Sequence, residues 1–184
     1  MSKPYTVFWE DSHQKLRDWW ETLDHDRGAR AELRRAESPA DVLLTQGFRS
    51  LCRTLAGYWT QESRLLALAA VGGILANVKD NSEQTKGKIQ SFAAQCAAFS
   101  DRGGDKPIVS EWRFSQLQKS RTLDELYTRM NRTVKLLGGK ANIVSIADGV
   151  LLWAKEMVEG EVDTDPRNRI LVRWGLDYFQ NLPN

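Results

Sequence analysis

Arginine side chains at helical spacing are the residues of this sequence best suited to a chemical task. In the predicted helix from Gly28 to Ala36, a rotation of about 100° per residue places Arg27, Arg30 and Arg34 within one sector of about 60°. The apolar residues fall on roughly the opposite side, which we expect to face the core. Arginine suits phosphate because its planar guanidinium group donates two parallel hydrogen bonds. The spacing thus allows a phosphate-binding surface, although it is at least as typical of a solvated helix face.

The predicted helix from Thr122 to Leu137 repeats this arrangement with a sharper contrast between its faces. Its apolar residues form one tight face, and Arg132 lies opposite, flanked by Arg129 and Lys135. Acidic residues occur in its first turn, where a helix N-terminus favours negative charge in any case. Arg121 stands just before this helix. Four more basic residues would join the surface if a polar loop folds toward it: Lys86, Lys88, Arg113 and Lys119.

Metal-dependent catalysis has little support in the residue types. The dipeptide His25-Asp26 occurs in metal-dependent HD phosphohydrolases, whose sites need several imidazoles and carboxylates around one or two metal ions. This chain has two histidines, His13 and His25, so the dipeptide is better explained as the polar end of a helix. Asp163 and Asp165 could hold a divalent cation, but a helix N-cap beside a proline explains them better.

Signatures of phosphate loops and of catalytic nucleophiles are also missing. The tripeptide Gly138-Gly139-Lys140 lacks the preceding glycine and the following Ser or Thr of a P-loop, and it stands at a predicted helix end. Cys52 and Cys96 lie in apolar helical surroundings without a Cys-x-x-Cys spacing, which predicts two reduced core cysteines. We therefore predict a protein that is not an enzyme and uses neither a metal nor a cofactor.

The composition indicates a folded protein with balanced charge. Hydrophobic residues make up 41% of the 184 residues, and seven tryptophans add to the material for a core. The 26 Lys+Arg against 24 Asp+Glu leave a net charge of +2, which is too even to indicate a nucleic-acid binder by itself. Trp19, Trp20, Trp153 and Trp174 stand at apolar helical positions, which favours core packing over base stacking.

Export and membrane insertion are not predicted. Residues 1–10 lack the long apolar stretch and the cleavage site of a signal peptide. The longest apolar run, residues 65–78, is shorter than the roughly 20 residues that cross a bilayer, so it predicts a buried helix. Together with reduced cysteines, these features favour a cytoplasmic protein without a membrane partner.

The elements that must position the basic residues are helices, because apolar residues recur with a period near 3.6 and no convincing strand pattern appears. The predicted helices cover residues 9–23, 28–36, 39–58, 60–78, 89–99, 110–117, 122–137, 143–157 and 166–178. N-cap residues are expected at Ser38, Thr60 and Ser110, and Thr122-x-x-Glu125 predicts a capping box. The fold class predicted is all-α.

Two breaks divide this helical pattern. Residues 79–88 form a polar loop by composition, and residues 101–107 are the strongest break in the chain because they combine glycine, proline and charge. We place a boundary at the second break. The prediction is two packed helical bundles, an N-terminal one over residues 1–103 and a C-terminal one over residues 104–184.

Four stretches in a fixed order carry a family resemblance. They are residues 28–36 after a Trp-containing first helix, the loop 82–87, the segment 110–117 leading into residues 123–126 and 132–137, and the pairing of residues 146–153 with 172–178. The set covers nearly the whole length and resembles the CasB family, the small subunit of the type I-E CRISPR Cascade surveillance complex. One departure is Gln95-Cys96-Ala97-Ala98, where the resemblance leads us to expect a more basic stretch. This argues against a nucleic-acid contact from the helix 89–99.

The resemblance implies two packed helical bundles and two copies per complex, lying along a guide-RNA assembly. It implies a role in holding the guide–target hybrid and the displaced DNA strand on basic surfaces, which stabilises the R-loop, while a separate protein supplies the nuclease. The partners would be guide RNA, target and non-target DNA, the backbone and large Cascade subunits, and a second copy of the chain. The phosphate contacts that the resemblance favours are Arg30, Arg34, Arg35, Lys86, Arg113, Arg121 and Arg132.

A different class of function remains open from the residues alone. A helical scaffold or adaptor that binds only proteins would show the same helices and the same balanced charge. Retention on single-stranded DNA at low salt would separate the two hypotheses, because the scaffold has no need of phosphate-binding faces.

Overall fold

The structure is a computed structural model that describes residues 10–57, 60–85, 87–99 and 106–182. Within these residues the chain forms ten α-helices, a short 3₁₀ helix and four strands of two residues each, which confirms the all-α prediction. The first helices are α1 (Glu10–His25), α2 (Arg27–Arg35), α3 (Pro39–Val42), α4 (Gln46–Leu55) and α5 (Glu62–Leu75). The later ones are α6 (Phe92–Ala97), α7 (Glu111–Gln118), α8 (Leu123–Leu136), α9 (Ile143–Met157), η2 (Pro166–Asn168) and α10 (Ile170–Gln180).

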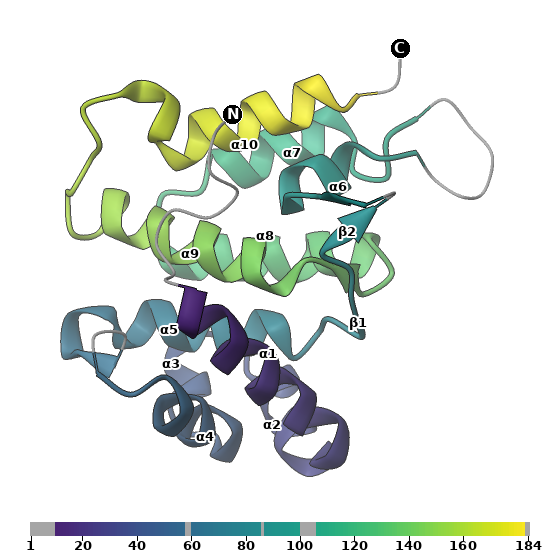
Figure 1. The fold of residues 1–184 in the computed structure, drawn as a ribbon. Helices are drawn as coiled ribbons and strands as arrows, with labels where there is room; N and C mark the ends of the chain where they lie inside the picture. The colour runs from purple at the N-terminus through teal and green to yellow at the C-terminus, as the bar shows by residue number, and fades with distance from the viewer. Residues whose placement is uncertain (1–9, 58–59, 86, 100–105, 183–184) are drawn as a thin grey trace.

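Helix α9 lies at the centre of the molecule. It packs against α5 on one side and against α10 on the other, as Figure 1 shows. Except for Lys155 and Met157, every residue of α9 is buried, which is expected of a helix that is apolar around most of its circumference. Helix α8 packs against α5 and α7, so α5 connects α8 to the central helix α9.

One connected hydrophobic core runs through the helices from both halves of the sequence. The four tryptophans predicted to pack in the core, Trp19, Trp20, Trp153 and Trp174, are buried. Both cysteines have free thiols, with Cys96 buried and Cys52 half-buried. Burial raises the pKa of the Cys96 thiol, so this thiol stays protonated.

Helix α6 lies with the C-terminal helices, although its sequence belongs to the predicted N-terminal bundle. It packs against α10, and the amides of Ile108 and Val109 donate to the carbonyls of Ala98 and Cys96 at 2.9 and 3.0 Å. The predicted boundary falls on residues 100–105, which lie outside the described residues. The division of the chain into residues 1–103 and 104–184 stays a prediction.

Local capping explains where the helices begin. Ser38 caps α3 with a capping box to Asp41, and Ser110 and Thr122 cap α7 and α8 as predicted. The capping box predicted for α8 does not form, because the Glu125 carboxylate accepts from the amide of Arg121 at 2.9 Å and not from that of Thr122. Thr60 does not cap α5, because its hydroxyl donates to the carbonyl of Gly57 at 2.9 Å. The single helix predicted over residues 39–58 is wrong as well. Thr45 accepts a hydrogen bond from the amide of Phe48, which starts α4 as a separate helix.

The polar segment after α5 is held by short strands rather than left as an open loop. Strand β1 (Asp80–Asn81) pairs in parallel with β4 (Lys140–Ala141), and β2 (Gln84–Thr85) pairs antiparallel with β3 (Lys88–Ile89). Strands of two residues are too short to show an alternating pattern, so they could not be predicted from the sequence. No helix in the described ranges is long and apolar enough to cross a membrane.

Candidate nucleic-acid interface

A groove of about 530 Å³ lies between α7 and α8. Its lining comes from both helices and consists of Trp112, Arg113 and Gln116 from α7, and Arg129, Arg132, Thr133, Lys135 and Leu136 from α8. Among these described lining residues there are four cationic side chains and no carboxylate. The groove therefore combines concentrated positive charge with an aromatic ring.

The sequence of α8 directs its basic residues toward this groove. Leu126, Met130 and Val134 are buried against the core, as the predicted apolar face requires. Arg132 and Lys135 lie away from that face and are exposed. The helix stops where predicted, because Gly138 and Gly139 adopt positive φ angles of 69° and 81°.

Arg129 fixes the distance between the two walls of the groove. Its Nη1 donates to the carbonyl of Gln116 at 2.8 Å and to Oγ of Ser120 at 3.1 Å, and it lies 3.7 Å from a carboxylate oxygen of Glu125. The side chain is half-buried by these contacts. Arg129 is thus mainly a bracket between α8 and the end of α7, and less available to an external anion.

Three other cations of the groove point their charge to solvent. Arg113, Arg132 and Lys135 are exposed, and none of them forms an ion pair with another described residue. Three like charges at one concave site attract a polyanion more strongly than scattered surface charges do. The structure thus brings together Arg113, predicted as a possible addition to this surface, with Arg132 and Lys135.

Trp112 is the aromatic lining residue of the groove, and it was not assigned to a site from the sequence. Trp112 is 70% exposed, whereas Phe114 and Leu117 of the same helix are each 1% exposed. A step of two residues rotates the side chain by about 200°, so Trp112 must point away from the face that buries Phe114. This rotation was available in the sequence and would have identified the exposed ring.

The other predicted surface, on α2, divides into two parts. Arg27, Arg34 and Arg35 are exposed, and no ion pair joins them to another described residue. The side chain of Arg30 is 15% exposed and is held within the fold. Its Nε donates to the carbonyl of Ala76 at 3.2 Å, and its two terminal nitrogens contact the Val78 carbonyl and the Asp24 carboxylate.

Helix α5 explains why Arg30 turns inward. Amides of the following residues already donate to the last carbonyls of α5, and the carbonyls of Ala76 and Val78, just beyond the helix, accept the Arg30 donors. The guanidinium carbon also lies 5.6 Å from the ring centroid of Trp20, within reach of a cation–π interaction. Arg30 is therefore committed to the packing of α2 on α5, at the centre of the predicted arginine stripe.

The remaining predicted site residues do not line the groove. Lys88 on β3, Lys119 at the end of α7 and Arg121 before α8 are exposed. Lys86 lies outside the described residues. The segment that carries Lys88 is held near α1 and the start of α9 by the contacts of Glu83 and Asn81.

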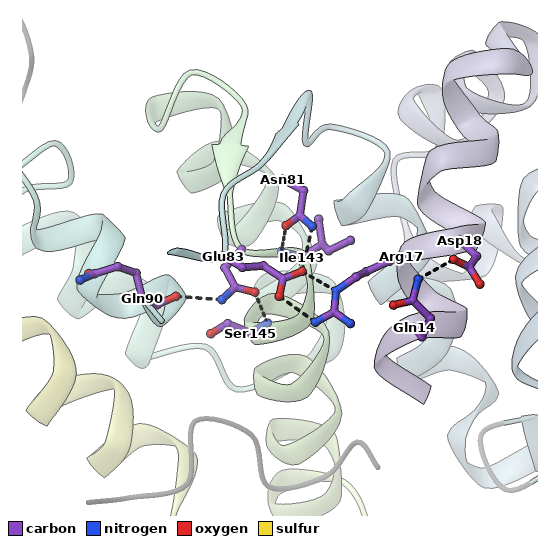
Figure 2. A network of polar contacts seen from close by, with 9 residues as sticks. Gln14, Arg17, Asp18, Asn81, Glu83, Gln90, Ile143 and Ser145 are labelled. Atoms are coloured by element: carbon purple, nitrogen blue, oxygen red, sulfur yellow. Dashed lines mark hydrogen bonds and ion pairs between the residues drawn. The ribbon is translucent and has the colours of Figure 1, made fainter. Parts of the chain in front are cut away.

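A polar network fixes this segment, as Figure 2 shows. Two nitrogens of Arg17 donate to the two carboxylate oxygens of Glu83, each at 2.7 Å. Asn81 donates to Glu83 at 2.9 Å and accepts from the amide of Ile143 at 3.2 Å. The hydrogen bond from Arg17 lowers the pKa of the Glu83 carboxyl, aided by the Asn81 hydrogen bond, although burial opposes this. The network ties α1 to the N-terminus of α9.

The described residues include no group of three or more His, Cys, Asp or Glu side chains placed to share a metal ion. His25 is exposed at the end of α1, and His13 is buried in its first half. Asp165 accepts a hydrogen bond from the amide of Arg167 at 3.0 Å, so it caps η2. The predicted start of the last helix at Pro166 is wrong, because the extended backbone of Arg169 separates η2 from α10, which begins at Ile170.

Comparison with known proteins gives one match. The family model described as CRISPR-associated protein Cse2 matches residues 29–179. This span includes most of α2, the residues Asn81 and Glu83 of the polar network, and the whole of the groove between α7 and α8. No curated protein and no solved structure gives a match.

Proposed function

The chain belongs to the CRISPR-associated protein Cse2 family, the small subunits of the type I-E CRISPR Cascade complex, and we propose that it binds nucleic-acid backbone there and stabilises the R-loop. The observation that carries this proposal is the groove between α7 and α8, with four cationic side chains and no carboxylate among its described lining residues. The chain is a Cascade subunit by its family; the mode of binding is our proposal.

The proposed contacts are ionic and do not read base edges. Arg113, Arg132 and Lys135 have their charge in solvent and would each take a phosphate oxygen of one strand. Contacts to phosphates position a protein on nucleic acid without conveying sequence information. A subunit of this kind suits a complex in which guide RNA pairing chooses the target, because it can hold any displaced or paired strand alike.

A second surface on α2 would support the same role. Helix α2, which carries Arg27, Arg34 and Arg35, lies on the opposite side of α5 from α7 in Figure 1. We propose that one surface holds one strand of the R-loop and the other surface another, without catalysis by this chain. The partners proposed are guide RNA, target and non-target DNA, the other Cascade subunits and a second copy, in the cytoplasm.

A test in the assembled complex separates this proposal from a protein scaffold. The double variant Arg132→Ala/Lys135→Ala is compared with Arg167→Ala, which removes a positive charge on η2 outside both surfaces. We expect the groove variant to capture target DNA and form R-loops less well while loading guide RNA normally. Arg167→Ala should match the parent complex. Unchanged R-loop formation in the groove variant would instead favour the scaffold hypothesis.

A further inference from the structure

Trp112 is exceptional among the tryptophans that the structure describes. Trp19, Trp20, Trp153 and Trp174 are 1%, 7%, 0% and 4% exposed, whereas Trp112 is 70% exposed. A large aromatic ring left in water forgoes the stabilisation of burial. Such a ring on the wall of a groove is therefore a candidate contact for a ligand with an apolar face.

The surroundings of Trp112 indicate the chemistry of that ligand. Arg113 stands beside it on α7, and Arg132 and Lys135 face it from α8 across the groove. Leu136, which is 40% exposed, adds a second apolar surface to the lining. The site thus offers cations for an anion and an aromatic plane for a flat ring, both within one cavity of about 530 Å³.

From this arrangement we infer that the groove selects unpaired nucleotides: one base stacks on the Trp112 indole while its flanking phosphates contact Arg113, Arg132 and Lys135. The inference rests on the proposed function and adds a preference to it. In a duplex the faces of the bases are covered by their neighbours, so only a single strand can present a base to the ring. Charge complementarity favours a nucleotide over an apolar side chain of a partner protein, because an apolar side chain would leave the three cations of the groove without partners.

Stacking on an aromatic side chain tolerates every base, because each base has a π-face. The groove would therefore distinguish single strands from duplexes without distinguishing sequences. Loss of one such stacking contact weakens binding by about fivefold to a hundredfold. The ionic contacts act equally on strands with and without bases, so the two contributions can be measured separately.

The test uses the full-length chain and three probes: an oligothymidylate, an abasic strand of the same length, and a duplex of that length. For the parent protein we expect the oligothymidylate to bind at least about fivefold more tightly than the abasic strand. Trp112→Ala should abolish this preference and leave the salt dependence of oligothymidylate binding as it was. Trp112→Phe should restore most of the preference, since it retains an aromatic plane.

The outcomes separate the inference from the proposed function. If the parent binds the abasic strand as tightly as oligothymidylate, or if Trp112→Ala keeps the preference, stacking on Trp112 is excluded while backbone binding stands. If no probe binds in a salt-dependent way, the proposed function itself fails. Far-UV circular dichroism of Trp112→Ala should match the parent, because the ring fills no core space. If Trp112→Ala instead binds another Cascade subunit more weakly and keeps the preference for oligothymidylate over the abasic strand, the groove binds a protein partner.

Discussion

The α2 surface and the groove between α7 and α8 begin from the same sequence pattern and end differently. Each helix carries basic residues opposite an apolar face. In the groove, Arg132 and Lys135 keep their charge in solvent. On α2, Arg30 turns back into the fold and donates to carbonyls at the end of α5. Equal spacing in sequence therefore does not produce equal availability to a ligand.

The difference follows from how neighbouring helices end. At the end of α8, the amides of Gly138 and Gly139 donate to the carbonyls of Lys135 and Val134, each at 3.0 Å. The glycine cap thus satisfies carbonyls that would otherwise seek a donor. Beyond α5 the amides of Asn77 and Val78 donate to the carbonyls of Ile74 and Leu75, whereas the carbonyls of Ala76 and Val78, which follow the helix, accept their hydrogen bonds from Arg30. An arginine is captured by the fold where backbone carbonyls at or beyond the end of a neighbouring helix lie within its reach.

The largest expected effect of this difference is on stability. Arg30→Ala should lower the free energy of unfolding by about 2–3 kcal/mol, because it leaves partly buried carbonyls without a donor. Urea unfolding of the full-length chain measures this. Arg30→Lys should recover only part of the loss, since a single ammonium group cannot reproduce the spread of donors of a guanidinium group. A midpoint equal to that of the parent would mean that Arg30 is not committed to the packing of α2.

The ion pair of Arg17 with Glu83 should make the stability of the protein depend on pH in the acid range. The pKa of the Glu83 carboxyl lies below its ordinary value of 4.5 in the folded protein, so the unfolded chain binds protons more readily. The contribution of the Glu83–Arg17 pair to the free energy of unfolding is fully present above the ordinary pKa of the carboxyl. It is lost as the pH falls through the lower pKa of the folded protein. Both side chains are partly exposed, so we expect about 1 kcal/mol or less.

The measurement for this pair compares urea unfolding of the parent and of Glu83→Gln at neutral pH and at about pH 3. The variant should lose less stability than the parent on acidification, because it lacks the titrating group. An equal loss in both proteins would show that the contact with Arg17 does not contribute.

The smallest effect is expected for Arg34, the exposed neighbour of Arg30 on the same helix. Arg34→Ala should change the free energy of unfolding by about 0.5 kcal/mol or less, as surface substitutions usually do. It is the matched partner of Arg30→Ala, since both remove one arginine from α2. Urea unfolding of the two variants, recorded side by side, measures this. If Arg34→Ala lowers the free energy of unfolding as much as Arg30→Ala does, the distinction between the two arginines is wrong.

Local signals made much of the fold predictable. Nearby residues alone predict the N-caps at Ser38, Ser110 and Thr122. They also predict that α8 ends before its two glycines and that its apolar face is buried. The break between α3 and α4 was missed because Thr45 can either continue a helix or cap a new one, and tertiary packing decides. In the candidate site, the outward position of Arg132 was predictable from the helical period alone.

What was not predictable depends on contacts between distant parts of the chain. Arg30 meets carbonyls 46 and 48 positions away, and no local pattern indicates that a helix end will arrive there. The same holds for the groove, since its shape requires α7 to pack against α8 through Arg129. Trp112 is different, because its outward direction was present in the helical spacing relative to Phe114.

The central claim is that the groove between α7 and α8 binds phosphate backbone through its exposed cations. A salt titration of oligonucleotide binding by filter retention tests it most directly, with Arg132→Ala measured beside the parent and Arg167→Ala. Each neutralised phosphate contributes about −0.7 to the log–log slope for a single strand and about −0.9 for a duplex. We predict that Arg132→Ala makes the slope shallower by nearly one such unit for unrelated sequences, while Arg167→Ala keeps the slope of the parent. Equal slopes and equal affinities in all three proteins would contradict the claim.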